Sequence, residues 1–223
     1  MPDLHTADDV LAALQTHADP GELPTVRRRL APDEPAIGMR MRDVFATAKA
    51  AAALPDREIV TLLADPRYEA RLAAFCVLDV RARRPRATAD ERRTLYELYL
   101  GHHDRITTWD MVDRAAPSVV GGYLLGRPAD PLVELAGSAD PLRRRTAITA
   151  PLWFVRYGDP GDLGPLFTVA ALLAGDPDPV VHRAVGIALK HAGGRDPHTV
   201  RAFLDDHGPR LPRPVARDAA AKL

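Results

Sequence analysis

Apolar residues recur at three- and four-residue spacing along most of this chain. Two clear cases are EARLAAFCVLDV at residues 69–80 and RRTAITAPLWFV at residues 144–155. Positions three and four apart lie on one face of a helix, so each segment predicts a helix with a buried side. Sustained alternation of apolar and polar residues, the pattern of a half-buried strand, is not found in any segment. The pattern therefore predicts an all-α fold.

Many of the 21 prolines directly follow an aspartate. An aspartate side chain accepts hydrogen bonds from the first backbone N–H groups of a helix, and proline suits the first helical position. We expect helices to start at six such pairs: Asp19-Pro20, Asp65-Pro66, Asp130-Pro131, Asp140-Pro141, Asp178-Pro179 and Asp196-Pro197. The pairs Gly121-Gly122 and Gly193-Gly194 are expected to interrupt helical segments.

The expected helix starts are also periodic. Asp65, Asp104, Asp140 and Asp178 are separated by 39, 36 and 38 residues. A period near forty residues with two helices in each unit is typical of HEAT-type helical repeats, in which neighbouring units stack into one core. We therefore expect a HEAT-like solenoid that forms a single domain over residues 1–223, with the helices before about residue 40 least well defined by the pattern.

Superposing the units predicts a functional surface. Five residues after each expected start lie Ala70, Trp109, Arg145 and Arg183, and one turn further lie Ala74, Asp113, Thr149 and Ile187. Residues four apart share a helix face, and equivalent positions in stacked repeats form a row. Because second helices usually line the concave side of a solenoid, we expect a tryptophan and a carboxylate between arginines on a concave strip.

Composition and charge give limited information about the binding partner and the location of the protein. The 30 basic and 30 acidic groups balance, but residues 1–65 hold 7 basic and 11 acidic groups, which leaves 23 and 19 for residues 66–223. Nearly all basic groups are arginines, which suit phosphate contacts. The polar start predicts no signal peptide, and the apolar run from Val169 to Ala174 is too short to span a membrane. With the single cysteine, Cys76, these features predict a cytoplasmic protein, and solenoids of this size are commonly monomers.

Other chemistries find little support in the sequence. His102 and His103 are adjacent, so they point to different sides of a helix, and no Cys/His ligand spacing accompanies them. The two serines lie outside any nucleophile-elbow motif, and no glycine-rich loop suits a phosphate. We therefore expect neither a metal nor a cofactor.

The segment ITTWDMVDRAAPSVVGGYL at residues 106–124 closely resembles the signature of the AlkD-type DNA glycosylases, a DNA alkylation-repair family. The segments RRRTAITAPLWFVRYGD, VHRAVGIALKHAGGRDP and LPRPVARDAAAKL continue the resemblance, which covers most of the chain from about Ile37. That family is built of HEAT-like repeats. The resemblance implies excision of positively charged alkylpurines, such as 3-methyladenine and 7-methylguanine, from duplex DNA, without burial of the flipped base.

The resemblance also implies roles for individual residues. In the family, the tryptophan matching Trp109 packs against the DNA backbone at the lesion. The aspartate matching Asp113 stabilises the sugar cation and positions the attacking water. An arginine of the pair Arg144 and Arg145 contacts DNA, and the repeat alignment favours Arg145. Ile187 replaces a second family tryptophan that forms the other wall around the sugar of the lesion.

Arg183 has two interpretations, because it can contact DNA or fill the HEAT position at which an arginine braces the neighbouring repeat. The whole chain also has alternatives. It is a glycosylase, a DNA-binding relative that has lost excision through the change at Ile187, or a HEAT-repeat scaffold for protein interactions. Salt-dependent binding to duplex DNA would separate the scaffold from the other two, and base release would separate the first two.

Overall fold

The computed structural model describes residues 4–223, and this part of the chain contains helices and connecting loops but no strand. The prediction of an all-α, helical-repeat fold is confirmed. Residues 1–3 lie outside the described residues. They begin the polar segment for which the sequence predicts no signal peptide. Contacts divide the chain into two compact units, with the division along the chain between Ala115 and Ala116. A single domain over residues 1–223 stays a prediction, and each unit is described by itself.

The first unit is built around one long buried helix, α5. Its helices are α1 (Ala7–Gln15), α2 (Leu23–Arg27), α3 (Met41–Ala50), α4 (Asp56–Ala64), α5 (Tyr68–Ala82), α6 (Ala89–Gly101), the short η1 (His103–Arg105) and α7 (Trp109–Ala116), whose last residue belongs to the second unit. Helices α3, α4 and α6 pack against α5, so nearly all of its side chains are buried, including Cys76.

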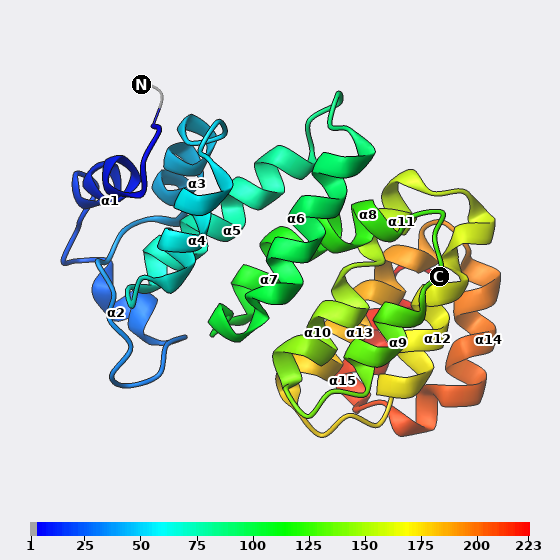
Figure 1. Ribbon diagram of the computed structural model, residues 1–223. Coiled ribbons are helices and arrows are strands. Elements are labelled where there is room, and N and C mark those ends of the chain that lie inside the picture. The colour runs from blue at the N-terminus through cyan, green and yellow to red at the C-terminus, as the bar shows by residue number, and fades with distance from the viewer. Residues whose placement is uncertain (1–3) are drawn as a thin grey trace. The chain divides into compact units, whose positions relative to one another are not determined.

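The second unit is built around α13 in the same way. Its elements are η2 (Pro117–Gly121), α8 (Gly122–Leu124), α9 (Asp130–Ala136), α10 (Pro141–Thr149), α11 (Leu152–Tyr157), η3 (Pro160–Leu163), α12 (Gly164–Leu173), α13 (Pro179–Gly193), α14 (Pro197–His207), η4 (Gly208–Arg210), α15 (Arg213–Ala219) and η5 (Ala220–Lys222). Helix α13 packs against α10, α12, α14 and α15, and its buried residues form the core of this unit (Figure 1).

Three of the expected aspartate caps are confirmed. The side chain of Asp140 accepts a hydrogen bond from the backbone N–H of Leu142 at 2.9 Å, at the start of α10. Asp178 does the same for Val180 at 2.8 Å, at the start of α13. Asp196 caps α14 through the N–H of Thr199 at 3.0 Å. In each case the proline that follows occupies the first helical position.

The start predicted at Asp65 is displaced, whereas the start predicted at Asp130 is confirmed but lacks the expected cap. The carboxylate of Asp65 accepts the backbone N–H of Arg67 at 2.8 Å and pairs with its guanidinium at 2.7 Å. Asp65 is therefore used in the turn between α4 and α5, and α5 begins only at Tyr68. Asp130 is itself the first residue of α9, after Ala129, and makes no capping hydrogen bond.

The starts predicted at Asp19 and Asp104 are wrong. Asp19 accepts a hydrogen bond from Gly21 in a turn, and α2 begins at Leu23. Asp104 lies within the short η1 turn, and the next α-helix begins at Trp109. A helix start needs more than an acceptor, because the chain that follows must continue in the helical conformation, and these two segments turn instead.

Gly121 does not interrupt its segment as predicted, because η2 runs directly into α8. It instead permits a close approach between chain segments: a Cβ at this position would lie 2.0 Å from the carbonyl oxygen of Ala150. The other predicted break is confirmed, since α13 ends at Gly193 with Gly194 as its C-terminal cap. No helix within the described residues is long and apolar enough to cross a membrane.

Candidate functional site

Helix α7 carries both residues that the sequence places at the centre of the site. Trp109 is its first residue, and 45% of the tryptophan surface is exposed. Asp113 follows one turn later and is half-buried. Because residues four apart share a helix face, α7 presents the indole and the carboxylate on the same side. The first unit therefore brings these two predicted residues together by local geometry alone.

A second carboxylate on α7, Asp110, is buried and takes no part in that face. It accepts a hydrogen bond from the Tyr68 hydroxyl at 2.6 Å and forms an ion pair with Arg29 at 2.7 Å. The hydroxyl of Thr108, the residue before the helix, also donates to it. Burial and the charge of Asp110 raise the pKa of Tyr68, which therefore stays a protonated donor.

The other end of α7 is held by Arg114. Its guanidinium forms an ion pair with Asp79 of α5 at 3.0 Å and lies 4.2 Å above the ring centroid of Phe45 in α3. Asp79 is completely buried and is also paired with Arg83 at 2.5 Å. Sequence reasoning missed Asp110, Arg114 and Asp79, because the residues that they contact are distant in sequence.

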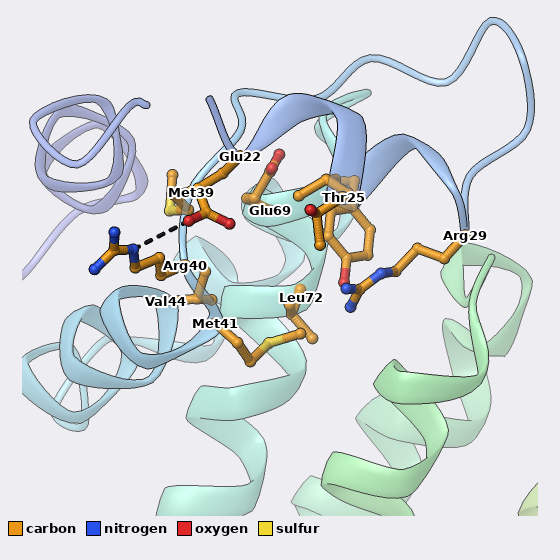
Figure 2. A pocket seen from close by; sticks show the side chains of 11 residues that line it. Glu22, Thr25, Arg29, Met39, Arg40, Met41, Val44, Glu69 and Leu72 are labelled. Carbon is orange, nitrogen blue, oxygen red and sulfur yellow. Dashed lines mark hydrogen bonds and ion pairs between the residues drawn. The ribbon is translucent and has the colours of Figure 1, made fainter. Parts of the chain in front are cut away.

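A small cavity of about 200 Å³ lies in the first unit (Figure 2). Its lining includes Arg29 and Tyr68, the two residues that contact Asp110 from distant segments. Met39 is among its apolar lining residues. Glu69 is buried there and accepts the backbone N–H groups of Ile37 at 2.8 Å and Gly38 at 2.9 Å. The acidic groups of the cavity are thus engaged within the protein, and Glu69 holds the segment that leads into α3.

In the second unit, α13 presents Arg183 and Ile187 one turn apart on one face. Both side chains are exposed, Ile187 to 42%. Arg183 makes no hydrogen bond or ion pair within the described residues, so it does not brace a neighbouring helix as the HEAT position suggests. It is a solvent-facing cation beside an apolar side chain.

The two arginines expected to contact DNA have structural partners. Arg144 forms an ion pair with Asp176 at 2.6 Å and donates to the carbonyl oxygen of Ser138 at 3.0 Å. Arg145 is only 4% exposed and donates to the carbonyl oxygen of Val180, in the first turn of α13. Both guanidinium groups therefore hold the start of α13 and the segment before it against α10.

The predicted row of equivalent residues is not uniform in exposure. Ala70 and Ala74 are fully buried, since α5 is enclosed by its neighbours, and Thr149 is 4% exposed. Arg143, by contrast, is half-exposed and makes no hydrogen bond or ion pair within the described residues. The repeat alignment favours Arg145 among these three consecutive arginines, but Arg145 is the one that the structure buries.

No group of three or more His, Cys, Asp or Glu side chains among residues 4–223 could hold a metal ion. On its exposed face, α7 carries the carboxylate of Asp113 and the indole of Trp109. A half-buried carboxylate stabilises nearby positive charge more strongly than one in bulk water, and an aromatic face attracts a cation. The exposed guanidinium of Arg183 suits a phosphate group.

Comparison with known proteins gives two positive results. A solved structure from Enterococcus faecalis, described as a predicted DNA alkylation repair enzyme, has a TM-score of 0.60 and 14% sequence identity; the match covers 100% of this chain and 98% of the other. That likeness supports the fold. The search of curated proteins gave no significant match. The sequence model of the family described as DNA alkylation repair enzyme matches residues 10–223. The chain therefore belongs to the family of DNA alkylation repair enzymes.

Proposed function

We propose that this protein is a DNA glycosylase that releases positively charged N3- and N7-alkylpurines from duplex DNA. In this proposal Asp113 is the catalytic carboxylate, Trp109 packs beside the lesion, and neither a metal nor a cofactor is needed. The observation that carries it is the shared face of α7, on which an exposed indole and a half-buried carboxylate lie one turn apart.

The chemistry needs little more than these groups. An alkylated ring nitrogen gives the purine a positive charge, so the base leaves with the electron pair of the glycosidic bond and becomes neutral. A general acid is therefore unnecessary. The sugar becomes an oxocarbenium-like cation, which a carboxylate can stabilise while it orients the attacking water, as in glycoside hydrolysis. Removing one such electrostatic group typically costs about 10²–10³ in rate.

Binding to DNA should follow the phosphate backbone and not the base sequence. Arg183 and Arg143 are cations without protein partners among the described residues, and arginine contacts phosphates well. The chain contains no asparagine and one glutamine, Gln15, so the side chains that commonly read adenine are nearly missing. Such binding suits a protein that must find damage at any sequence.

The test is release of 7-methylguanine and 3-methyladenine from methylated duplex DNA by the wild-type protein and by Asp113→Asn. The proposal expects release by the wild type and a loss of about 10²–10³ in single-turnover rate for Asp113→Asn. Asp104→Asn, which changes an exposed carboxylate outside α7, is the matched control and should keep the wild-type rate. Full activity of Asp113→Asn would overturn the assignment.

Ile187 supports a second candidate function, that of a DNA-binding relative without excision. Its side chain is 42% exposed at the position where the resembling family has a tryptophan, and isoleucine has no aromatic face for a developing cation. Salt-dependent binding to duplex DNA without release of either base would favour this candidate. A protein that neither binds DNA nor releases a base would instead fit a helical-repeat scaffold.

A further inference from the structure

Two adjacent faces of helix α7 carry functional or charged side chains. Trp109 and Asp113 lie on one, and Asp110 and Arg114, also four residues apart, lie on the next. The second face is fixed to the rest of the first unit by charged contacts at both of its positions. Asp110 is held by Tyr68 at 2.6 Å and by Arg29 at 2.7 Å, whereas Arg114 is held by Asp79 at 3.0 Å.

These two anchors control the rotation of the helix about its axis. They are separated by about 6 Å along the helix, because four residues rise about 1.5 Å each. A single anchor would allow the helix to pivot, but two anchors on one face, tied to different partners, resist it. A rotation of roughly 10° would move a carboxylate that lies about 6 Å from the axis by about 1 Å. A misplacement of about 1 Å can reduce a rate by about 10²-fold.

We propose that Asp110 and Arg114 are positioning residues, which fix the direction in which α7 presents Trp109 and Asp113. The part of this inference that concerns rate rests on the proposed glycosylase function. The part that concerns the orientation of Trp109 does not, because it can be measured in the protein without DNA.

The contacts offer variants of graded severity. Tyr68→Phe removes one of the donors to Asp110 and keeps the ring, which is buried. Arg114→Gln removes the charge that reaches Asp79 from α7. The matched control is Arg83→Gln, because Arg83 pairs with the same buried carboxylate from the C-terminal cap of α5 and not from α7. Arg114→Lys keeps a positive charge at position 114.

The orientation of Trp109 can be followed by fluorescence, since the chain has only two tryptophans. Trp153→Phe makes Trp109 the single reporter, and its exposed fraction of 45% lets a neutral quencher such as acrylamide reach it. Tyr68→Phe and Arg114→Gln should change the quenching constant and the emission maximum of Trp109, whereas Arg83→Gln should leave both unchanged. Far-UV circular dichroism tests whether each variant is folded. If Arg114→Gln does not fold, Tyr68→Phe alone tests the orientation of Trp109.

Unchanged Trp109 fluorescence in both Tyr68→Phe and Arg114→Gln would overturn the inference, as would an equal change in Arg83→Gln. In the excision assay, Arg114→Gln should lower the single-turnover rate by about 10–100-fold and leave the dissociation constant for DNA unchanged. Arg114→Lys should regain part of that rate. Weaker DNA binding at an unchanged rate would also contradict the inference. If the wild-type protein releases no base, the proposed function fails, and the fluorescence result still decides the positioning role.

Discussion

At the scale of single residues, α7 shows how two aspartates three positions apart acquire different roles. Asp110 is 7% exposed and surrounded by donors, so its negative charge is used to hold the helix. Asp113 is half-buried on the face that also carries an exposed tryptophan. A carboxylate that is buried beneath its neighbours is out of reach of a substrate, and this difference in exposure favours Asp113 in the proposed catalytic role.

Ile187 gives a residue-scale prediction. Ile187→Trp should raise the excision rate by about 2–30-fold, because an aromatic face beside a cation contributes about 0.5–2 kcal/mol. The side chain is 42% exposed, so the larger indole needs no room in the core. Single-turnover release of 7-methylguanine measures the gain. Leu172→Trp, at an exposed position of α12, is the matched control, and an equal gain in that variant would exclude a specific effect at position 187.

At the scale of helices, the aspartate-proline pairs have two different outcomes. Asp178 caps α13 and Asp140 caps α10 through backbone hydrogen bonds, whereas Asp130 is part of α9 and makes none. All three aspartates precede a proline, so the dipeptide alone does not predict which of them caps a helix. The geometry of the residue before the helix decides, because a cap must be extended while the residues after it are helical.

The capping contacts predict different stabilities. Asp178→Ala and Asp140→Ala should each lower the free energy of unfolding by about 1 kcal/mol, the usual effect of losing an N-terminal cap. Asp130→Ala is the control and should lose less, since the Asp130 side chain accepts no capping hydrogen bond from α9. Urea denaturation followed by circular dichroism measures the three values. Equal losses in all three variants would show that the cap hydrogen bonds are not the cause.

At the scale of the whole molecule, zero formal net charge does not exclude a nucleic-acid partner. Many of the 30 basic groups are neutralised locally, as Arg144 is by Asp176 and Arg114 is by Asp79. The charge available to a partner depends on the cations left exposed without a partner, such as Arg183. Net charge counts paired and unpaired basic groups equally, so it does not show how many cations are available to a partner.

DNA binding should therefore depend on salt and not on sequence. Arg183→Ala should weaken binding to unrelated duplexes equally and reduce the slope of log affinity against log salt concentration by about 1. Fluorescence anisotropy with labelled duplexes over a series of salt concentrations measures this slope. Arg93→Ala is the control, because Arg93 is exposed but paired with Glu97 at 2.8 Å. A slope unchanged by Arg183→Ala would remove Arg183 from the DNA-binding surface.

The sequence by itself determined the features that depend on neighbouring residues along the chain. Helical periodicity predicted an all-α fold, and it placed Trp109 with Asp113 and Arg183 with Ile187 on shared faces. Three aspartate caps followed from the same local rules. These features could be predicted because hydrogen bonds within four residues and the 3.6-residue turn fix them.

Only the tertiary structure decided which of these side chains are available to a partner. Arg145 is buried by α13, and Asp110 is held by Tyr68 and Arg29, from segments far from it in sequence. Arg183 remains exposed although its repeat position suggested a brace. Burial and ion pairing depend on the packing of helices that are distant in the chain, and the spacing of residues within one helix carries no information about that packing.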